Sequence, residues 1–154
     1  MEPKVVNHCL LKTNKKNSNW NYNPKFAYCK QEGSGNNWAY GYNHHGPQCE
    51  SAILDQFRTL LEKIDYVQAL LFFQSLAGGT GSGLGSYLLE SVKEEFPKYS
   101  VLNISVMPHL TGEVILQSYN CVLSLSSIYK VLYNNKVICE EVLIKKKNLR
   151  NLMV

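Results

Sequence analysis

Glycines and hydroxyl side chains are concentrated between residues 77 and 83. The segment Ala77-Gly78-Gly79-Thr80-Gly81-Ser82-Gly83 holds four glycines and two hydroxyl residues, and it directly follows an apolar run. Because glycine has no Cβ, a ligand can approach the main chain closely, and several N–H groups can point at one anion. The segment therefore predicts a phosphate-binding loop in which Thr80 and Ser82 add hydroxyl donors. The alternative is a tight strand-to-helix turn that binds nothing, although one or two glycines would suffice for it.

A strand, a helix and a second strand are predicted to position this loop. Residues 69–76 form a nearly continuous apolar run, which is typical of a strand buried on both faces. After the glycines, Leu84, Leu88 and Val92 share one helical face, and residues 101–107 form a second apolar run. This order predicts a βαβ unit with parallel strands. Its helix would direct a partial positive N-terminus at a bound phosphate.

Two further helices and two irregular segments are predicted around this unit. After Pro47, apolar residues recur at helical spacing, namely Ile53, Leu54, Phe57, Leu60, Leu61 and Ile64. A second helical face, expected to run to about Tyr129, comprises Ile115, Leu116, Tyr119, Val122 and Leu123. Residues 1–32 are rich in Asn and are expected to be a long loop, and residues 33–46 are expected to contain a tight loop.

The glycine loop matches neither of two well-known phosphate-loop patterns. The Walker pattern needs Lys and then Ser or Thr directly after its last glycine, whereas Leu84-Gly85 follow here. The dinucleotide pattern G-x-G-x-x-G fails because its third glycine comes one place early, at Gly85. A third class of phosphate loop is therefore needed.

Gly-Gly-Thr-Gly-Ser-Gly after an apolar strand resembles the signature of the tubulin superfamily. Residues 35–41, Gly-Asn-Asn-Trp-Ala-Tyr-Gly, are similar to that family's Ala-Asn-Asn-Tyr-Ala-Arg-Gly loop, and residues 117–120 are similar to its Glu-Pro-Tyr-Asn segment. Residues 33–42, 45–47 and 111–115 most resemble the delta-tubulin subfamily. The resemblance implies an α/β fold: part of a tubulin-type, Rossmann-like nucleotide-binding domain with parallel strands and flanking helices.

The same resemblance implies which residues bind GTP or GDP and Mg²⁺. The nucleotide-binding residues would be Asn36, Gly78, Gly79, Thr80, Gly81, Ser82 and Glu113. Asn36 would stand at the γ-phosphate end, and Glu113 would meet the ribose unless it only caps a helix. Glu2, in a segment similar to the family's Leu-Glu-Pro loop, would act on Mg²⁺ through water unless it is merely a terminal acid. Trp38, Tyr40 and Tyr42 are expected to be packing residues.

The resemblance covers residues 1–129 and leaves parts of the family's nucleotide domain unmatched. The family's first strand and Gly-Gln-Cys-Gly-Asn-Gln loop would precede Met1, and residues 130–154 are expected to be a divergent C-terminal tail without a recognisable guanine-reading motif. A parallel sheet without these parts would expose apolar surface and open strand edges. Autonomous GTP hydrolysis is not expected, because the family completes its site with an acidic residue from the next subunit.

The function implied by the resemblance is GTP binding in a cytoplasmic, cytoskeletal protein linked to microtubules, centrioles and basal bodies. Its partners would be alpha/beta-tubulin or other tubulins. Three alternatives stay open: a GTPase that needs a partner's acid, an interaction module that binds tubulin without nucleotide, and a degenerate chain without autonomous binding.

Composition is that of a globular domain. The 154 residues are 45% hydrophobic and 18% charged, which excludes highly charged disordered chains. Part of the net charge of +4 is concentrated at Lys145, Lys146, Lys147 and Arg150, but acidic residues are dispersed among the lysines, so nucleic-acid binding is not expected. No apolar run approaches the roughly 18 residues of a membrane span. Cys9, Cys29, Cys49, Cys121 and Cys139 are expected to be reduced and buried. Their spacing disfavours zinc binding with His8, His44, His45 or His109.

Overall fold

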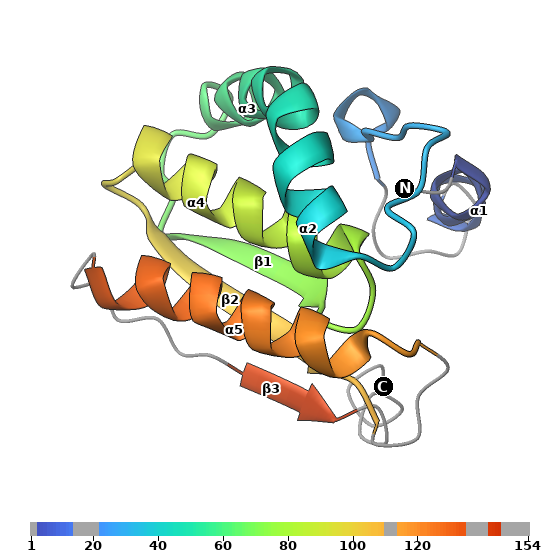
Figure 1. Ribbon diagram of the computed structural model, residues 1–154. Coiled ribbons are helices and arrows are strands. Elements are labelled where there is room, and N and C mark those ends of the chain that lie inside the picture. The colour runs from blue at the N-terminus through green and yellow to red at the C-terminus, as the bar shows by residue number, and fades with distance from the viewer. Residues whose placement is uncertain (1–2, 14–21, 110–113, 135–141, 146–154) are drawn as a thin grey trace. The chain divides into compact units, whose positions relative to one another are not determined.

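The computed structural model describes residues 3–13, 22–109, 114–134 and 142–145 (Figure 1). The chain divides into two units, Met1–Gly33 and Ser34–Val154, and each is described by itself. The first unit contains helix α1 (Pro3–Thr13) and the short 3₁₀ helix η1 (Pro24–Phe26). The expectation of a long loop over residues 1–32 is therefore wrong for α1. Val6 and Leu10, one helical turn apart, are the half-buried apolar residues of this helix.

The second unit is built on the predicted βαβ arrangement. Strand β1 (Ala69–Ser75) pairs in parallel with β2 (Ser100–Met107), with Leu70 opposite Val101. The crossover between them is a π-helical turn, η3 (Thr80–Leu84), that continues directly into helix α4 (Gly85–Glu95). A third strand, β3 (Val142–Lys145), pairs in parallel with β2, so the sheet order is β1-β2-β3. The sequence alone did not predict β3.

Three consecutive elements form one long helical segment before β1. These are α2 (Trp38–Tyr40), the π-helical turn η2 (Gly41–His45) and α3 (Gly46–Leu61). The Asn37 side chain begins this segment by accepting a 2.9 Å hydrogen bond from the Ala39 N–H. The helix predicted after Pro47 is confirmed, and it begins nine residues earlier. Only the first part of residues 33–46 is a loop.

Helices cover one face of the sheet and enclose the core of this unit (Figure 1). Helix α4 and helix α5 (Gln117–Asn134) lie across this face, and the Phe57 ring of α3 stacks on Phe72 of β1 at 6.2 Å. The core residues are Leu76, Leu89, Val101, Cys121, Ile128 and Val131, with Leu70, Phe72, Met107 and Leu125 packed against them. Burial of this apolar set provides the main driving force for folding of the unit.

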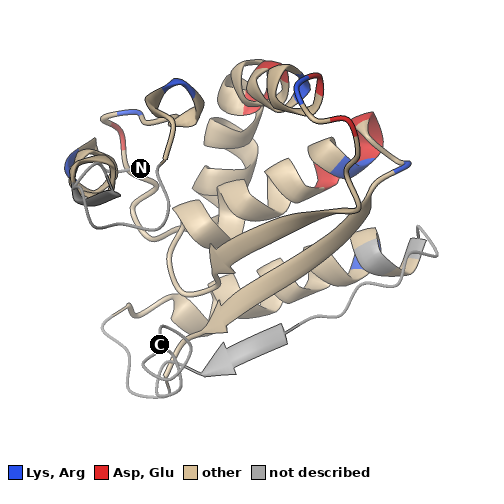
Figure 2. Cartoon of the chain, turned by 180° about the vertical axis from the view of Figure 1, so that it is seen from behind, with Lys and Arg blue, Asp and Glu red and all other residues tan. Residues whose placement is uncertain are grey.

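The opposite face of the sheet is exposed over β1. Leu71 and Phe73 are 52% and 68% exposed, and in the view from behind no described helix lies over the strands (Figure 2). Alternation along a strand places these two side chains on the face opposite Leu70 and Phe72. The expectation that this strand is buried on both faces is therefore wrong among the described residues.

Helix α5 is turned differently from the sequence-based expectation. Of the predicted apolar face, Tyr119, Val122 and Leu123 are 72%, 66% and 43% exposed. The buried side instead carries Asn120 and Ser124, together with apolar residues further along the helix. Both polar side chains have hydrogen-bond partners, which offset the free-energy cost of burying a polar group. The helix also runs to Asn134, past the predicted end near Tyr129.

The cysteines only partly follow the prediction. The described cysteines, Cys9, Cys29, Cys49 and Cys121, form no disulfide, but Cys9 and Cys29 are exposed and only Cys49 and Cys121 are buried. Within the described residues, no helix is long and apolar enough to span a bilayer.

Candidate functional site

The glycine loop leads from β1 into the crossover helix. Gly79 immediately precedes the helical turn, and its carbonyl accepts a 2.8 Å hydrogen bond from the Gly83 N–H. The N–H groups in the first turn of a helix have no acceptor within the helix, and they carry the positive end of its dipole. Residues 80–82 therefore present backbone donors at this end of the Thr80–Glu95 helical segment. π-helical turns such as η3 occur frequently at functional sites.

A second loop, residues 34–37, lies against the glycine loop. Gly35 and Asn36 both have positive φ angles, 56° and 53°. This left-handed backbone is unusual for a residue with a Cβ, and Asn is among the side chains that tolerate it best. Asn36 Oδ1 lies 3.4 Å from the position that a Cβ on Gly78 would occupy. The fold thus brings Asn36 to the first glycine of the loop across about 40 residues of sequence.

Three of the loop's four glycines, Gly79, Gly81 and Gly83, are explained by close packing of the main chains. A Cβ on Gly81 would lie 2.7 Å from the Ser75 carbonyl oxygen. A Cβ on Gly79 would lie 2.6 Å from the Asn37 nitrogen, and a Cβ on Gly83 would collide with the Trp38 carbonyl oxygen. Real Cβ atoms do not make such contacts, so these positions require glycine whether or not a ligand binds. Gly78 differs, because within the described part of the chain the one neighbour within 4 Å of a Cβ there is Asn36 Oδ1, at 3.4 Å. Gly78 is the glycine that packing leaves unexplained.

The two hydroxyls of the loop already have partners within the protein. Ser82 is fully buried, and its Oγ donates to the carbonyl of Gly78. Thr80 Oγ1 shares a 3.1 Å hydrogen bond with Ser34 Oγ, which links the two loops. In this structure the Ser82 hydroxyl therefore donates within the loop. Ser82 can contribute its N–H to a phosphate site.

Sequence reasoning missed a polar bridge behind the two loops. Glu90 of α4 accepts hydrogen bonds from the hydroxyls of Tyr42 in η2 and Ser127 in α5. Burial, and then the hydrogen bond to the negatively charged Glu90, raise the pKa of Tyr42 well above its usual value. Tyr42 also stacks on Trp38 at 4.6 Å and meets Tyr87 edge-on at 5.3 Å. Trp38 and Tyr42 are thus packing residues, as the sequence predicted.

Asn120 of α5 was also missed as a structural residue. Its side chain contacts the main chain of both loops, through the carbonyls of Asn36 and Ala77 and the N–H of Trp38. The only signal in the sequence was its place in the segment Gln117-Ser118-Tyr119-Asn120, which assigned it no role.

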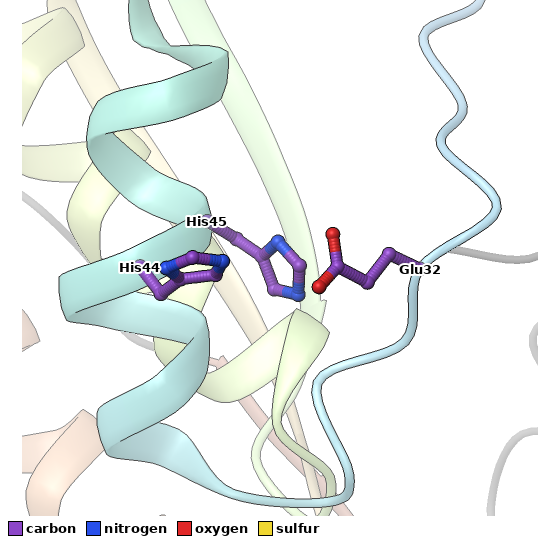
Figure 3. A group of neighbouring side chains, drawn as sticks. All are labelled: Glu32, His44 and His45. Atoms are coloured by element: carbon purple, nitrogen blue, oxygen red, sulfur yellow. The ribbon is translucent and has the colours of Figure 1, made fainter.

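Two predicted site residues lie outside the described residues: Glu2 and Glu113. The histidines at the end of η2, His44 and His45, have ring centroids 5.4 Å apart (Figure 3). Both rings also contact the Tyr40 ring, at 4.6 Å and 5.0 Å. Glu32, the third residue drawn in Figure 3, belongs to the unit Met1–Gly33.

Comparison with known proteins establishes the family. Residues 1–146 match the family model described as Tubulin/FtsZ family, GTPase domain. The chain belongs to this family. It is 42% identical over 130 residues to the tubulin delta chains of Mus musculus and Homo sapiens. The matched region is 84% of this chain and 28% of each relative, so the chain spans just over a quarter of their length.

These comparisons confirm the resemblance to the tubulin superfamily and to its delta branch. They also confirm the fold class, a partial α/β Rossmann-like GTPase domain with a parallel sheet. The family match extends to residue 146, past residue 129, where the sequence pattern alone predicted the resemblance to end. Strand β3 falls inside this extension.

Proposed function

We propose that this tubulin-family chain binds GTP or GDP, with the phosphates held between the glycine loop and Asn36. The observation that carries the proposal is the position of the Asn36 carboxamide beside Gly78, at the N-terminal end of the Thr80–Glu95 helical segment. A left-handed Asn, an unobstructed glycine and a helix N-terminus at one place favour an anion there. Membership of the Tubulin/FtsZ GTPase-domain family makes a guanine nucleotide the expected source of that anion.

Each predicted residue then has a specific role. The main chain of Gly78, Gly79, Thr80, Gly81 and Ser82 would cradle the β- and γ-phosphates, and Asn36 would donate its side-chain amide at the γ-phosphate end. Glu113 would meet the ribose. Mg²⁺ would be held chiefly by phosphate oxygens and water, with Glu2 acting through one of those waters, because magnesium keeps much of its hydration shell.

The wider biology is part of the same proposal. Similarity to tubulin delta chains supports a cytoskeletal role. The proposal extends to alpha/beta-tubulin or other tubulins as partners, at microtubules, centrioles and basal bodies in the cytoplasm. Hydrolysis of GTP would require an acidic residue supplied by a partner subunit. The chain alone would bind nucleotide without turning it over.

Equilibrium titration with GTP, with ATP as the competitor control and Mg²⁺ present, tests the binding proposal. The informative variant is Gly78→Ala, because its Cβ fits the protein and projects toward Asn36, into the space proposed for phosphate. The matched control is Gly33→Ala, where a Cβ meets no atom of the described residues within 4 Å. We expect GTP binding by the parent and by Gly33→Ala, and at least a tenfold weaker affinity in a folded Gly78→Ala, roughly the effect of one lost charge-assisted hydrogen bond. Equal binding by all three chains would refute the site.

A second function is favoured by the exposed apolar residues. Leu71 and Phe73 on β1, and Tyr119 and Val122 on α5, are each at least half exposed. Such surfaces suit an interaction module that contacts tubulin subunits. This alternative predicts that tubulin binds with the same affinity in the presence and absence of GTP, and in the parent and the Gly78→Ala variant.

A further inference from the structure

Asn120 joins three backbone positions from two segments that are far apart in the sequence, residues 36–38 and Ala77. Its Nδ2 donates to the carbonyl of Asn36 at 2.8 Å and to that of Ala77 at 2.9 Å. Its Oδ1 accepts from the N–H of Trp38 at 3.0 Å. The residue is only 2% exposed, so these groups have no access to water as a substitute partner. One side chain therefore supplies hydrogen-bond partners to the second loop (residues 34–37), to Trp38 directly after it, and to Ala77, which precedes the glycines.

The chemistry of these partners allows only one orientation of the carboxamide. Turning it over would place Oδ1 against two carbonyl oxygens and the NH₂ group against the Trp38 N–H, so every contact would be repulsive. Only Asn offers two donors and one acceptor in this shape. The residue is itself anchored, since its carbonyl accepts a 2.7 Å hydrogen bond from Ser124 Oγ and its N–H donates to Leu116 at 3.0 Å.

We propose that Asn120 is a positioning residue, which holds the Asn36 loop against the glycine loop and thereby keeps the phosphate site assembled before nucleotide arrives. The arrangement explains how Asn36 keeps its left-handed backbone beside Gly78, because its own carbonyl is one of the two groups that Asn120 binds. The effect on nucleotide affinity rests on the proposed function. The effect on the two loops does not.

Two variants and one control separate positioning from general stability. Asn120→Asp keeps the shape and the acceptor for Trp38, but it directs a carboxylate at two carbonyl oxygens. Asn120→Ser shortens the side chain without adding charge, and it serves if the Asp variant does not fold. The control is Lys93→Met, since buried Lys93 donates to the carbonyls of Pro97 and Tyr99, beyond the opposite end of the crossover helix.

The first readout is amide hydrogen exchange of the ligand-free full chain. We expect the amides of residues 34–41 and 76–84 to exchange roughly 10- to 100-fold faster in a folded Asn120 variant than in the parent. The amides of residues 85–95 should exchange at the parent's rate. Lys93→Met should leave both loops at the parent's rate relative to the rest of the chain. Unchanged loops, or an equal acceleration over the whole chain, would overturn the proposal.

The second readout is GTP affinity in the presence of Mg²⁺. We expect the Asn120 variants to bind roughly tenfold more weakly or worse, and Lys93→Met to bind within about twofold of the parent. Faster loop exchange with unchanged GTP affinity would show that Asn120 does not position the site. If the parent itself fails to bind GTP, the proposed function fails, and hydrogen exchange still decides whether Asn120 holds the two loops together.

Discussion

Replacing Tyr42 by Phe should destabilise the chain at pH 8, and the loss should shrink as the pH rises above 10. The substitution removes the hydroxyl that donates to Glu90 and leaves the ring stacked on Trp38. A hydrogen bond to a charged acceptor contributes about 1.5–3 kcal/mol when fully buried, and we expect about 1–2 kcal/mol here because the pair is only partly buried. This is a large share of the stability of a small domain.

The dependence on pH follows from the raised pKa of Tyr42. Burial and Glu90 favour the protonated phenol in the folded state, whereas an unfolded tyrosine titrates near pH 10. Above about pH 10 the folded chain therefore retains a proton that the unfolded chain loses, and stability falls by at most about 1.4 kcal/mol per pH unit. Phe at position 42 cannot titrate, so the parent should lose about 1 kcal/mol more than the variant between pH 8 and pH 11.

Urea unfolding followed by circular dichroism at pH 8, 10 and 11 measures this difference. Comparing parent with Tyr42→Phe cancels the other titrating groups, including Tyr87, whose pKa is also raised by burial and by its hydrogen bond to Glu50. A gap between parent and variant that is independent of pH, or that widens toward pH 11, would refute the assignment of Tyr42 to the Glu90 bridge.

Four further substitutions have expected effects on the free energy of unfolding. Gly79→Ala should cost about 1–3 kcal/mol, because its Cβ would overlap the Asn37 main chain, and a cost near zero would contradict the close packing of the two loops. Ile128→Ala should cost about 2–5 kcal/mol, because it opens a cavity in the core. Tyr129, which is 65% exposed, should tolerate Ala within about 0.5 kcal/mol. Similar costs at the two positions would contradict the orientation of α5. Lys93→Met should cost about 1–3 kcal/mol, because it leaves two carbonyls without their donor. A variant that melts at the same temperature as the parent would contradict this role of Lys93.

The βαβ unit and its glycine loop could be predicted because their signals are local. Continuous apolar runs mark β1 and β2, and glycines between a strand and a helix mark a turn with close backbone approach. The α5 helix was predicted but turned the wrong way, since the pattern assumes that apolar residues face inward. Here the inward side carries Asn120 and Ser124, whose burial depends on partners that are distant in the sequence.

The packing inside the site could not be predicted from residue types. Nothing in the local sequence shows that the Asn37 main chain leaves room only for glycine at position 79, or that position 78 has room for a Cβ. Nor does it show that the Ser82 hydroxyl donates to the carbonyl of Gly78. The pairing of β3 with β2 depends likewise on a contact across about 38 residues and has no local signal. Helix α1 was missed because the Asn-rich composition of residues 1–32 as a whole masks it, although Val5, Val6, Cys9, Leu10 and Leu11 make up five of its 11 residues.

The most direct test of the account is to map where nucleotide touches the chain. Backbone amide chemical shifts of the full chain, recorded during titration with GTP and separately with inorganic tripolyphosphate, report this residue by residue. We expect the largest changes with both ligands at Gly78–Ser82 and Asn36. Saturable GTP binding that leaves these amides unmoved, with its largest shifts elsewhere, would contradict a phosphate site at the glycine loop.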